Sequence, residues 1–446
     1  MRTRTVALGA VLALAGLCCA TPPVAAATAG HPSSTAGRPS FSTERLWGPH
    51  NDWEPNIAAA PGSPWLYQMT TQYGGHRVCQ PKMNHCILLR SSPDRGRTWS
   101  RPVVMPRRQC PPGRFCRLAA WQNDPGIAVS SSGVVYAAWM NQWDVTFGIS
   151  RDHGRTWTGL HDFRRAAGLS FTDKPWITIS PSGRDVYVAF NSSDSYVSAS
   201  HDYGRTWSMP VKTNTNGRYW FAEAGAVAPD GDVYFAESAE HQDAKGDILL
   251  AVLSSANGGA TWRTRYVARS QQQPHCPTKG CPNDFYGAQT SLAIDPAGTI
   301  MVAYAANAVP QAPMLPYEIT SADGGRSWTA PHALGPGGAK VGADFPKVAA
   351  GLRPGDFRVA WEDDRNGATA WNVWYRATAN GGASWSPAIR LSDRGSGAPY
   401  KSRAGFRFPY GDYFGITVDS RGTSYLIWSE GTSYDGPGGT WWAREN

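Results

Sequence analysis

Ser150-Arg-Asp-His-Gly-Arg-Thr-Trp157 is one of six similar segments in a chain of 446 residues. The other five segments occupy 92–99, 200–207, 255–262, 321–328 and 378–385. An Asp or Asn side-chain oxygen accepts hydrogen bonds from backbone N–H groups further along, and Gly supplies the positive φ of a tight turn. Because Asn257 and Asn380 replace Asp in two copies, the charge is dispensable. We therefore interpret these residues as structural rather than catalytic.

A second repeat lies upstream of each turn segment. It is a pair of short stretches with alternating apolar positions, which is typical of a β-hairpin. Seven hairpins are expected, at 54–72, 124–140, 173–190, 223–237, 288–304, 345–361 and 412–428. The C-terminal 439–446 resembles 372–379, and 41–46 resembles 385–390. An N-terminal strand that completes the last unit would remove two exposed sheet edges.

The composition excludes several classes of protein. Hydrophobic residues make up 41% of the chain and charged residues 17%, so a disordered chain or a coiled coil is excluded. The 48 Gly, 34 Pro and 20 Trp suit short strands joined by tight turns. The net charge of +8 is modest for this length and part of it lies in the N-terminal segment, so we expect no nucleic-acid partner.

The first residues predict export. Arg2 and Arg4 precede an apolar stretch at 6–20, and small residues at 25–29 offer cleavage sites after Ala27 or Ala29. We expect a signal peptide at 1–29, a short linker at 30–40 and one domain at 41–446, with no membrane span and a secreted, extracellular mature protein. Leu17, placed before Cys18, disfavours lipoprotein processing.

Six cysteines remain after the signal peptide and form three close pairs: Cys79 and Cys86, Cys110 and Cys116, Cys276 and Cys281. Six cysteines allow fifteen connectivities. Proximity favours three local disulfides, which an oxidising destination would preserve. A zinc site is a weaker interpretation, since no pair has the C-x-x-C spacing.

The S-x-D-x-G-x-T-W segments resemble the Asp-box, or BNR repeat, of the sialidase superfamily. Six copies at this spacing extend the resemblance over nearly the whole mature chain. The resemblance implies an all-β, single β-propeller of four-stranded blades, each Asp box joining a blade's third and fourth strands. Seven hairpins favour seven blades, with six as the alternative, and the N-terminal strand closes the last blade.

In such a propeller the starts and ends of the hairpins meet on one face, opposite the Asp boxes. Charged and tyrosine side chains are frequent at these positions, and we expect them to line a substrate-binding cleft. The expected binding residues are Glu54, Asp124, Lys174, Tyr286, Glu362, Arg365, Arg407 and Asp412. The loops with the three cysteine pairs fall on the same face.

Resemblance to sialidases implies exo-glycosidase action on a terminal acidic sugar of an extracellular glycan or glycoprotein. That chemistry uses a Tyr nucleophile, a Glu that activates it, an Asp acid/base and an Arg cluster for the substrate carboxylate. The matching candidates are Tyr413 or Tyr286 as nucleophile, Glu223 or Glu237 as base, Asp173 or Asp124 as acid, and Arg365 with Arg407, then Arg218, for the carboxylate. The R-I-P signature of sialidases is missing, and Glu54-Pro-Asn-Ile57 occupies the comparable strand.

Two other classes of function remain open. A polysaccharide lyase would use Tyr, His or Lys to abstract a proton beside a uronate carboxylate, which cations would neutralise; Lys174, Lys347 and Tyr413 would serve. A non-catalytic binding propeller would use tryptophans as stacking platforms, namely Trp53, Trp121, Trp143 and Trp176.

No cofactor is expected, although carboxylates in the pore could hold Ca²⁺ through Asp124, Asp173 or Asp412. The absence of G-x-S-x-G argues against a serine hydrolase.

Overall fold

The computed structural model describes residues 39–48, 51–73, 78–79, 83–107, 120–214, 216–242, 245–275, 287–336, 341–367, 371–392, 413–431 and 438–446. Arg38–Asn446 forms one compact unit. Its one helix in these ranges is α1 (Phe163–Ala167), which ends at Gly168 in the left-handed conformation. No helix in the described ranges is long and apolar enough to cross a membrane. The predicted signal peptide lies outside the described residues.

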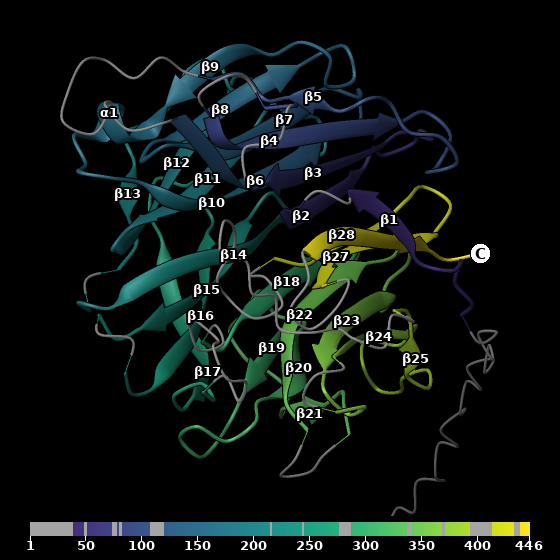
Figure 1. The fold of residues 1–446 in the computed structure, drawn as a ribbon. Coiled ribbons are helices and arrows are strands. Elements are labelled where there is room, and N and C mark those ends of the chain that lie inside the picture. The colour runs from purple at the N-terminus through teal and green to yellow at the C-terminus, as the bar shows by residue number, and fades with distance from the viewer. Residues whose placement is uncertain are drawn as a thin grey trace, which may run out of the picture. The chain divides into compact units, whose positions relative to one another are not determined.

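Most strands form antiparallel four-stranded sheets, of which five are separate (Figure 1). The first two sheets contain β10 (Asp173–Ile179), β11 (Val186–Ser192), β12 (Asp194–Ser200) and β13 (Val211–Lys212), then β14 (Tyr219–Val227), β15 (Val233–Glu240), β16 (Ile248–Ser255) and β17 (Arg263–Ser270). The next two contain β18 (Thr290–Ile294), β19 (Ile300–Ala306), β20 (Leu315–Ser321) and β21 (His332–Ala333), then β22 (Ala343–Ala350), β23 (Phe357–Asp363), β24 (Asn372–Thr378) and β25 (Ile389–Arg390).

The fifth separate sheet joins the two ends of the described chain. It contains β26 (Gly415–Val418), β27 (Ser424–Gly431), β28 (Gly438–Arg444) and, beside β28, the N-terminal β1 (Arg45–Gly48). Leu46 pairs with Trp441, and a bridge between Phe41 and Glu445 extends the pairing. The N-terminal strand thus completes the last sheet, as the sequence predicts.

The remaining strands form one eight-stranded sheet. It contains β2 (Asp52–Ala59), β3 (Leu66–Gln72), β4 (Met83–Ser92) and β5 (Val103–Val104), then β6 (Ala120–Val129), β7 (Val135–Asn141), β8 (Val145–Ser150) and β9 (Thr158–Asp162). A short parallel pairing of β4 with β6, with His85 opposite Trp121, joins the two halves. Five blades are therefore separate four-stranded sheets, and the predicted count of seven or six separate blades does not hold for the sheets as they are paired.

The first strand of each expected hairpin packs against the first strand of the next. β2 contacts β6, β6 contacts β10, and the series continues through β14, β18, β22 and β26, which contacts β2. Every expected hairpin is present as an antiparallel pair. The fold is an all-β propeller with four-stranded blades, as the Asp-box resemblance implies.

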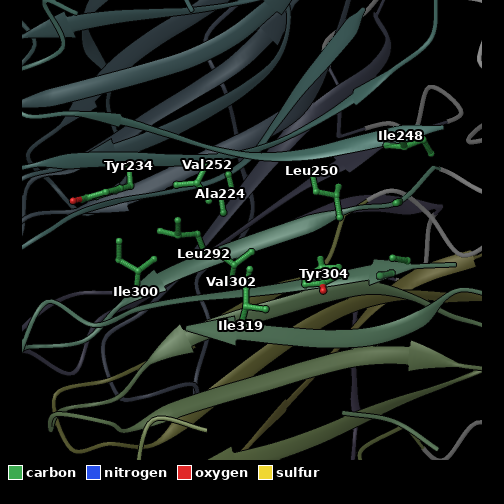
Figure 2. Close-up of a cluster of buried hydrophobic side chains, with 14 of the residues drawn as sticks. Ala224, Tyr234, Ile248, Leu250, Val252, Leu292, Ile300, Val302, Tyr304 and Ile319 are labelled. Carbon is green, nitrogen blue, oxygen red and sulfur yellow. The ribbon is translucent and has the colours of Figure 1, made fainter. Parts of the chain in front are cut away.

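Apolar side chains between neighbouring sheets hold the sheets together. Figure 2 shows one such cluster, in which Leu250 and Val252 of β16 face Leu292 and Val302 of the next sheet. These side chains alternate along each strand because successive residues point to opposite faces. Burying each of them contributes about 1.5–3 kcal/mol relative to exposure, so the clusters between sheets fix how the blades pack.

The Asp boxes are turns closed by their own side chains. The Asp152 carboxylate accepts hydrogen bonds from the Thr156 N–H at 2.8 Å and the Thr156 hydroxyl at 2.7 Å. The Ser150 hydroxyl accepts from the Gly154 N–H at 2.8 Å. The same contacts recur in the boxes of Asp94, Asp202 and Asp323. These hydrogen bonds hold the pKa of Asp152 down at about 2.

The two boxes with Asn form the same turn, but the direction of one hydrogen bond is reversed. The Asn257 side-chain oxygen accepts from the Thr261 N–H at 3.0 Å, while its amide donates to the Thr261 hydroxyl at 2.9 Å. Asn380 and Ser384 form the same pair of contacts. The box therefore needs the acceptor and not the charge, which supports a structural role for all six.

Substitution of Asp152 should separate these two contributions. We expect Asp152→Ala to lower the free energy of unfolding by about 1 kcal/mol, because both Thr156 contacts are lost. Asp152→Asn should lower it less, since the arrangement at Asn257 becomes available. Denaturant unfolding measures both.

The pH dependence follows from the lowered pKa of Asp152. This carboxyl stabilises the fold above its ordinary pKa of 3.8, and the contribution is lost as the pH falls towards 2. The difference between wild type and Asp152→Asn should therefore shrink in acid. Equal destabilisation by Asn and Ala at neutral pH would contradict the interpretation.

Candidate functional site

Five of the first strands contain a β-bulge near their start, which decides where their side chains point. The pairing register shifts at Glu54-Pro55, Asp124-Pro125, Lys174-Pro175, Glu223 and Phe345-Pro346. A bulge leaves an extra residue out of the ladder and increases the local twist, which redirects the side chain. Pro suits this place, since it has no N–H to contribute to the ladder.

The residues before proline adopt an unusual backbone conformation. The φ angles of Glu54, Asp124, Lys174 and Phe345 are 54°, 55°, 49° and 52°. A positive φ is strained for residues other than glycine, and such strain gathers at functional sites when the surroundings enforce it. Three of these four residues are charged, which makes the bulges a candidate functional feature.

Hydrogen bonds link the bulges from one strand to the next. The buried Glu54 carboxylate accepts from the Thr71 hydroxyl at 2.6 Å, the Tyr73 hydroxyl at 2.5 Å and the Asp124 N–H at 2.8 Å. Asp124 in turn accepts from the Lys174 ammonium group at 3.2 Å. Contacts with a neighbouring strand thus fix the orientation of each charged side chain before any ligand binds.

Glu223 occupies the fourth bulge. Its carboxylate accepts from the Ser238 hydroxyl at 2.7 Å and from the Thr290 N–H, and its carbonyl accepts from the Lys347 ammonium group at 3.2 Å. Burial raises the pKa of Glu223 to about 7, against the opposing effect of the positive charge of Lys347. A carboxyl group with this pKa can take up or release a proton near neutral pH.

One pocket joins these bulges to aromatic residues. Its described lining includes Lys174, Glu223, Lys347, Trp176 and Tyr413, and the pocket is partly open to solvent. The Lys174 ammonium group lies 4.7 Å from the Tyr413 ring centroid, and that of Lys347 lies 5.3 Å from the Trp176 ring centroid. The pocket therefore combines two cations, a phenol and a titratable carboxyl group.

Five residues expected from the sequence meet in this pocket, namely Tyr413, Glu223, Lys174, Lys347 and Trp176. Asp173 directly precedes Lys174 and accepts a hydrogen bond from the Tyr219 hydroxyl at 3.4 Å. Glu237 is fully buried, accepts from the Ser195 hydroxyl and does not line the pocket. Burial raises its pKa to about 8.

The expected arginine cluster is only partly described. Arg365 forms a two-pronged ion pair with Asp363 and stacks on Trp374, 3.5 Å from its ring centroid. Arg218 is held by Asp247 at 3.0 Å. Glu362 is buried, and burial with the nearby Glu430 and Asp344 charges raises its pKa well above the ordinary value. Four expected site residues or groups lie outside the described residues: Tyr286, Arg407, Asp412 and the cysteines 110, 116, 276 and 281.

The sequence did not single out the polar residues Ser238, Glu240 and Gln289, which also line the pocket. Burial, together with the nearby charge of Glu223, raises the pKa of Glu240 to about 7. The alternation along β15 could have suggested Ser238 and Glu240. The bulge at Glu223 of the paired strand β14, however, changes which β14 residues lie opposite them.

One predicted disulfide is confirmed. Cys79 and Cys86 are bonded, with Cα atoms 5.6 Å apart. Within the described ranges, no group of three or more His, Cys, Asp or Glu side chains could hold a metal ion. Calcium binding through Asp124, Asp173 and Asp412 stays a prediction, because Asp412 lies outside those ranges.

The chain belongs to the family of BNR repeat-like domains, whose pattern matches residues 49–277. This membership confirms the relationship to the sialidase superfamily that the Asp boxes indicate. Among curated proteins, none is similar enough in sequence to match this chain.

Several solved structures share the fold. An ulvan lyase, a polysaccharide lyase bound to GlcA(1-4)Rha3S, is 12% identical over 89% of this chain and 95% of its own, with a TM-score of 0.53. A protein of unknown function from Dyadobacter fermentans is 14% identical over 91% of this chain and 98% of its own, with a TM-score of 0.52. A Hadza microbial sialidase is 15% identical over 88% of this chain, which spans 65% of that sialidase, with a TM-score of 0.47. At these identities the similarity shows the fold alone.

The carboxyl group of Glu223 should titrate near neutral pH. We expect its midpoint near 7 in ¹³C NMR of protein with labelled glutamate side chains, with Glu223→Gln assigning the resonance. Lys347→Met should raise the midpoint further, because the Lys347 charge lowers the pKa of Glu223. A midpoint at the ordinary value of 4.5, or no response to Lys347→Met, would contradict the described environment.

Proposed function

We propose that the protein is a glycan-acting enzyme that binds a terminal acidic sugar in the pocket of Tyr413 and Glu223. The observation that carries the proposal is that Lys174 and Lys347 line the same pocket as these two residues. Two ammonium groups beside a phenol and a carboxyl group suit a substrate with a carboxylate next to the reacting carbon. The similarity of fold to an ulvan lyase adds only an analogy.

The reaction proposed first is sialidase-type hydrolysis. The Tyr413 oxygen attacks the anomeric carbon while Glu223 accepts the phenol proton, and the bond to the leaving glycosyl oxygen breaks as Asp173 protonates that oxygen. Water then cleaves the sugar–tyrosine bond and restores the enzyme. Lys174, 4.7 Å from the Tyr413 ring centroid, favours negative charge on the phenol oxygen during attack. A neutral tyrosine suits this role because it does not repel a substrate carboxylate.

A second reaction, lyase cleavage of a uronate glycan, is favoured by the type of cation. Among the described residues the pocket is lined by two lysines and no arginine. Arg365 and Arg218 are each paired with a carboxylate elsewhere. In the lyase reaction, Lys174 and Lys347 would neutralise the uronate carboxylate, and Tyr413 as phenolate would remove the adjacent proton. The bond to the leaving glycosyl oxygen would break as a carbon–carbon double bond forms, and Tyr413 would pass the proton to that oxygen and return to the phenolate.

We also propose that the eight-stranded sheet is two blades joined through β4 and β6, which gives seven blades. The support is that β2 and β6 each begin a four-strand meander and occupy successive places among the first strands.

The Cys79–Cys86 disulfide and the charged, then apolar, N-terminus support action outside the cell.

A panel of sialosides and uronate polysaccharides tests the activity. Released sialic acid would support the hydrolase, and ultraviolet absorbance of an unsaturated product would support the lyase. Tyr413→Phe should lower kcat by about 100-fold or more in either case, because Phe supplies neither nucleophile nor base. Tyr266→Phe, on the exposed outer strand β17, should leave kcat unchanged.

The pH profile provides an independent check of Glu223. A general base must be ionised, so the ionisation of Glu223 should contribute a limb on which kcat/KM rises with pH through about 7. No product from any substrate, together with saturable binding of one of them, would replace the enzyme proposal by the binding propeller.

A further inference from the structure

A row of five aromatic rings lies beside the bulges of Glu54 and Asp124. We call it the aromatic row; it contains Tyr73, His85, Trp121, Trp143 and Phe171. Successive ring centroids are 4.8, 5.8, 5.3 and 6.2 Å apart. The parallel pairing of β4 with β6 sets His85 opposite Trp121, so the joint between the two halves of the eight-stranded sheet also builds the row.

Trp143 is the most exposed tryptophan of the described residues. Trp143 is 43% exposed, and the other tryptophans of the described residues are half-buried or buried. The remaining four rings of the row are half-buried. An exposed indole leaves apolar surface in contact with water. Where other aromatic rings adjoin it, the rings form an apolar patch, and such patches mark interaction sites.

Hydrogen bonds fix the backbone beneath the row. The Gln142 N–H donates to the Trp121 carbonyl at 3.0 Å, and the Thr172 N–H donates to the Trp143 carbonyl at 3.1 Å. The Val145 N–H donates to the Thr172 hydroxyl at 2.7 Å. The rings are therefore presented by rigid turns, so that a ligand would bind them without first ordering a loop.

The Tyr73 end of the row is linked to the proposed pocket by hydrogen bonds and an ion pair. The Tyr73 hydroxyl donates to Glu54, whose carboxylate also accepts from the Asp124 N–H. Asp124 pairs with Lys174, and Lys174 lines the pocket. Two carboxylates and one lysine thus connect the row to the pocket, and a ligand that extends beyond the pocket along this side would lie against the rings.

We infer that the aromatic row binds the glycan chain that continues from the acidic sugar held in the pocket. This inference rests on the proposed function. The flat C–H faces of sugar rings are apolar and stack on aromatic side chains, while their hydroxyl edges stay in water. Burial lowers the pKa of His85 to about 4, so this ring is neutral at neutral pH and suits stacking. The protein then favours long chains over short ones.

The test compares ligand lengths in Trp143 variants. Tryptophan fluorescence and affinity electrophoresis measure the Kd of a uronate disaccharide, the matching octasaccharide and long-chain hyaluronan, and sialyl oligosaccharides of two lengths are measured in parallel. Trp143→Leu keeps an apolar side chain without a ring, Trp143→Phe restores a ring, and Tyr266→Leu removes an equally exposed ring on outer strand β17. The unfolding midpoint of each variant controls for folding.

We expect wild type to bind the longer ligand more tightly than the short one. Trp143→Leu should raise the Kd of the longer ligand about tenfold, leave that of the short one unchanged, and be partly rescued by Trp143→Phe. Tyr266→Leu should change neither. Equal Kd values of wild type and Trp143→Leu for the longer ligands, or no gain in affinity with length, would overturn the inference.

Failure of the row and failure of the proposed function give different results. If the row is wrong but the function holds, Tyr413→Phe abolishes turnover while Trp143→Leu leaves the Kd and KM of long ligands unchanged. If the function is wrong but the row binds chains, no product forms and Trp143→Leu still weakens binding of the longer ligand.

Discussion

The β-bulge near the start of the first strands is the constraint on which the candidate site depends. It holds Glu54, Asp124 and Lys174 at positive φ, a conformation that these residues would not adopt without enforcement. The enforcement comes from the neighbouring strands, since the Asp124 N–H is bonded to Glu54 and Asp124 is bonded to Lys174. The packed strands of the propeller therefore hold the backbone rigid, and the bulges orient the charged side chains towards the pocket.

The pocket places the positive charge of Lys347 near the carboxyl groups of Glu223 and Glu240, which can titrate near neutral pH. Lys347 donates to the carbonyl of Glu223 and lies over Trp176, so its charge stays close to the carboxyl group of Glu223. Burial dominates at Glu223 and Glu240 and raises both pKa values to about 7. The site thus keeps acid/base capacity near neutral pH, whereas the Asp boxes, with their lowered pKa values, stay ionised and structural.

The fold could be predicted further than the site because its signals are local. Six Asp boxes, seven hairpins and the similarity of the two chain ends predicted the blades and the pairing of β1 with β28. The joining of β4 to β6 was missed, since it depends on two bridges between distant segments. Glu223, Lys174 and Tyr413 were expected from their place at hairpin starts, and the structure brings them to one pocket. Ion pairs such as Arg365 with Asp363 could not be foreseen, because they depend on side-chain geometry.

We propose that the bulged strands hold an acidic sugar between two lysines. A crystal structure of the Tyr413→Phe variant with an acidic oligosaccharide bound tests this most directly. We expect the sugar carboxylate to lie within hydrogen-bond distance of the ammonium groups of Lys174 or Lys347, with the reacting carbon facing the ring at position 413. A ligand bound on the Asp-box side, or in the pocket with its carboxylate turned away from both lysines, would contradict it.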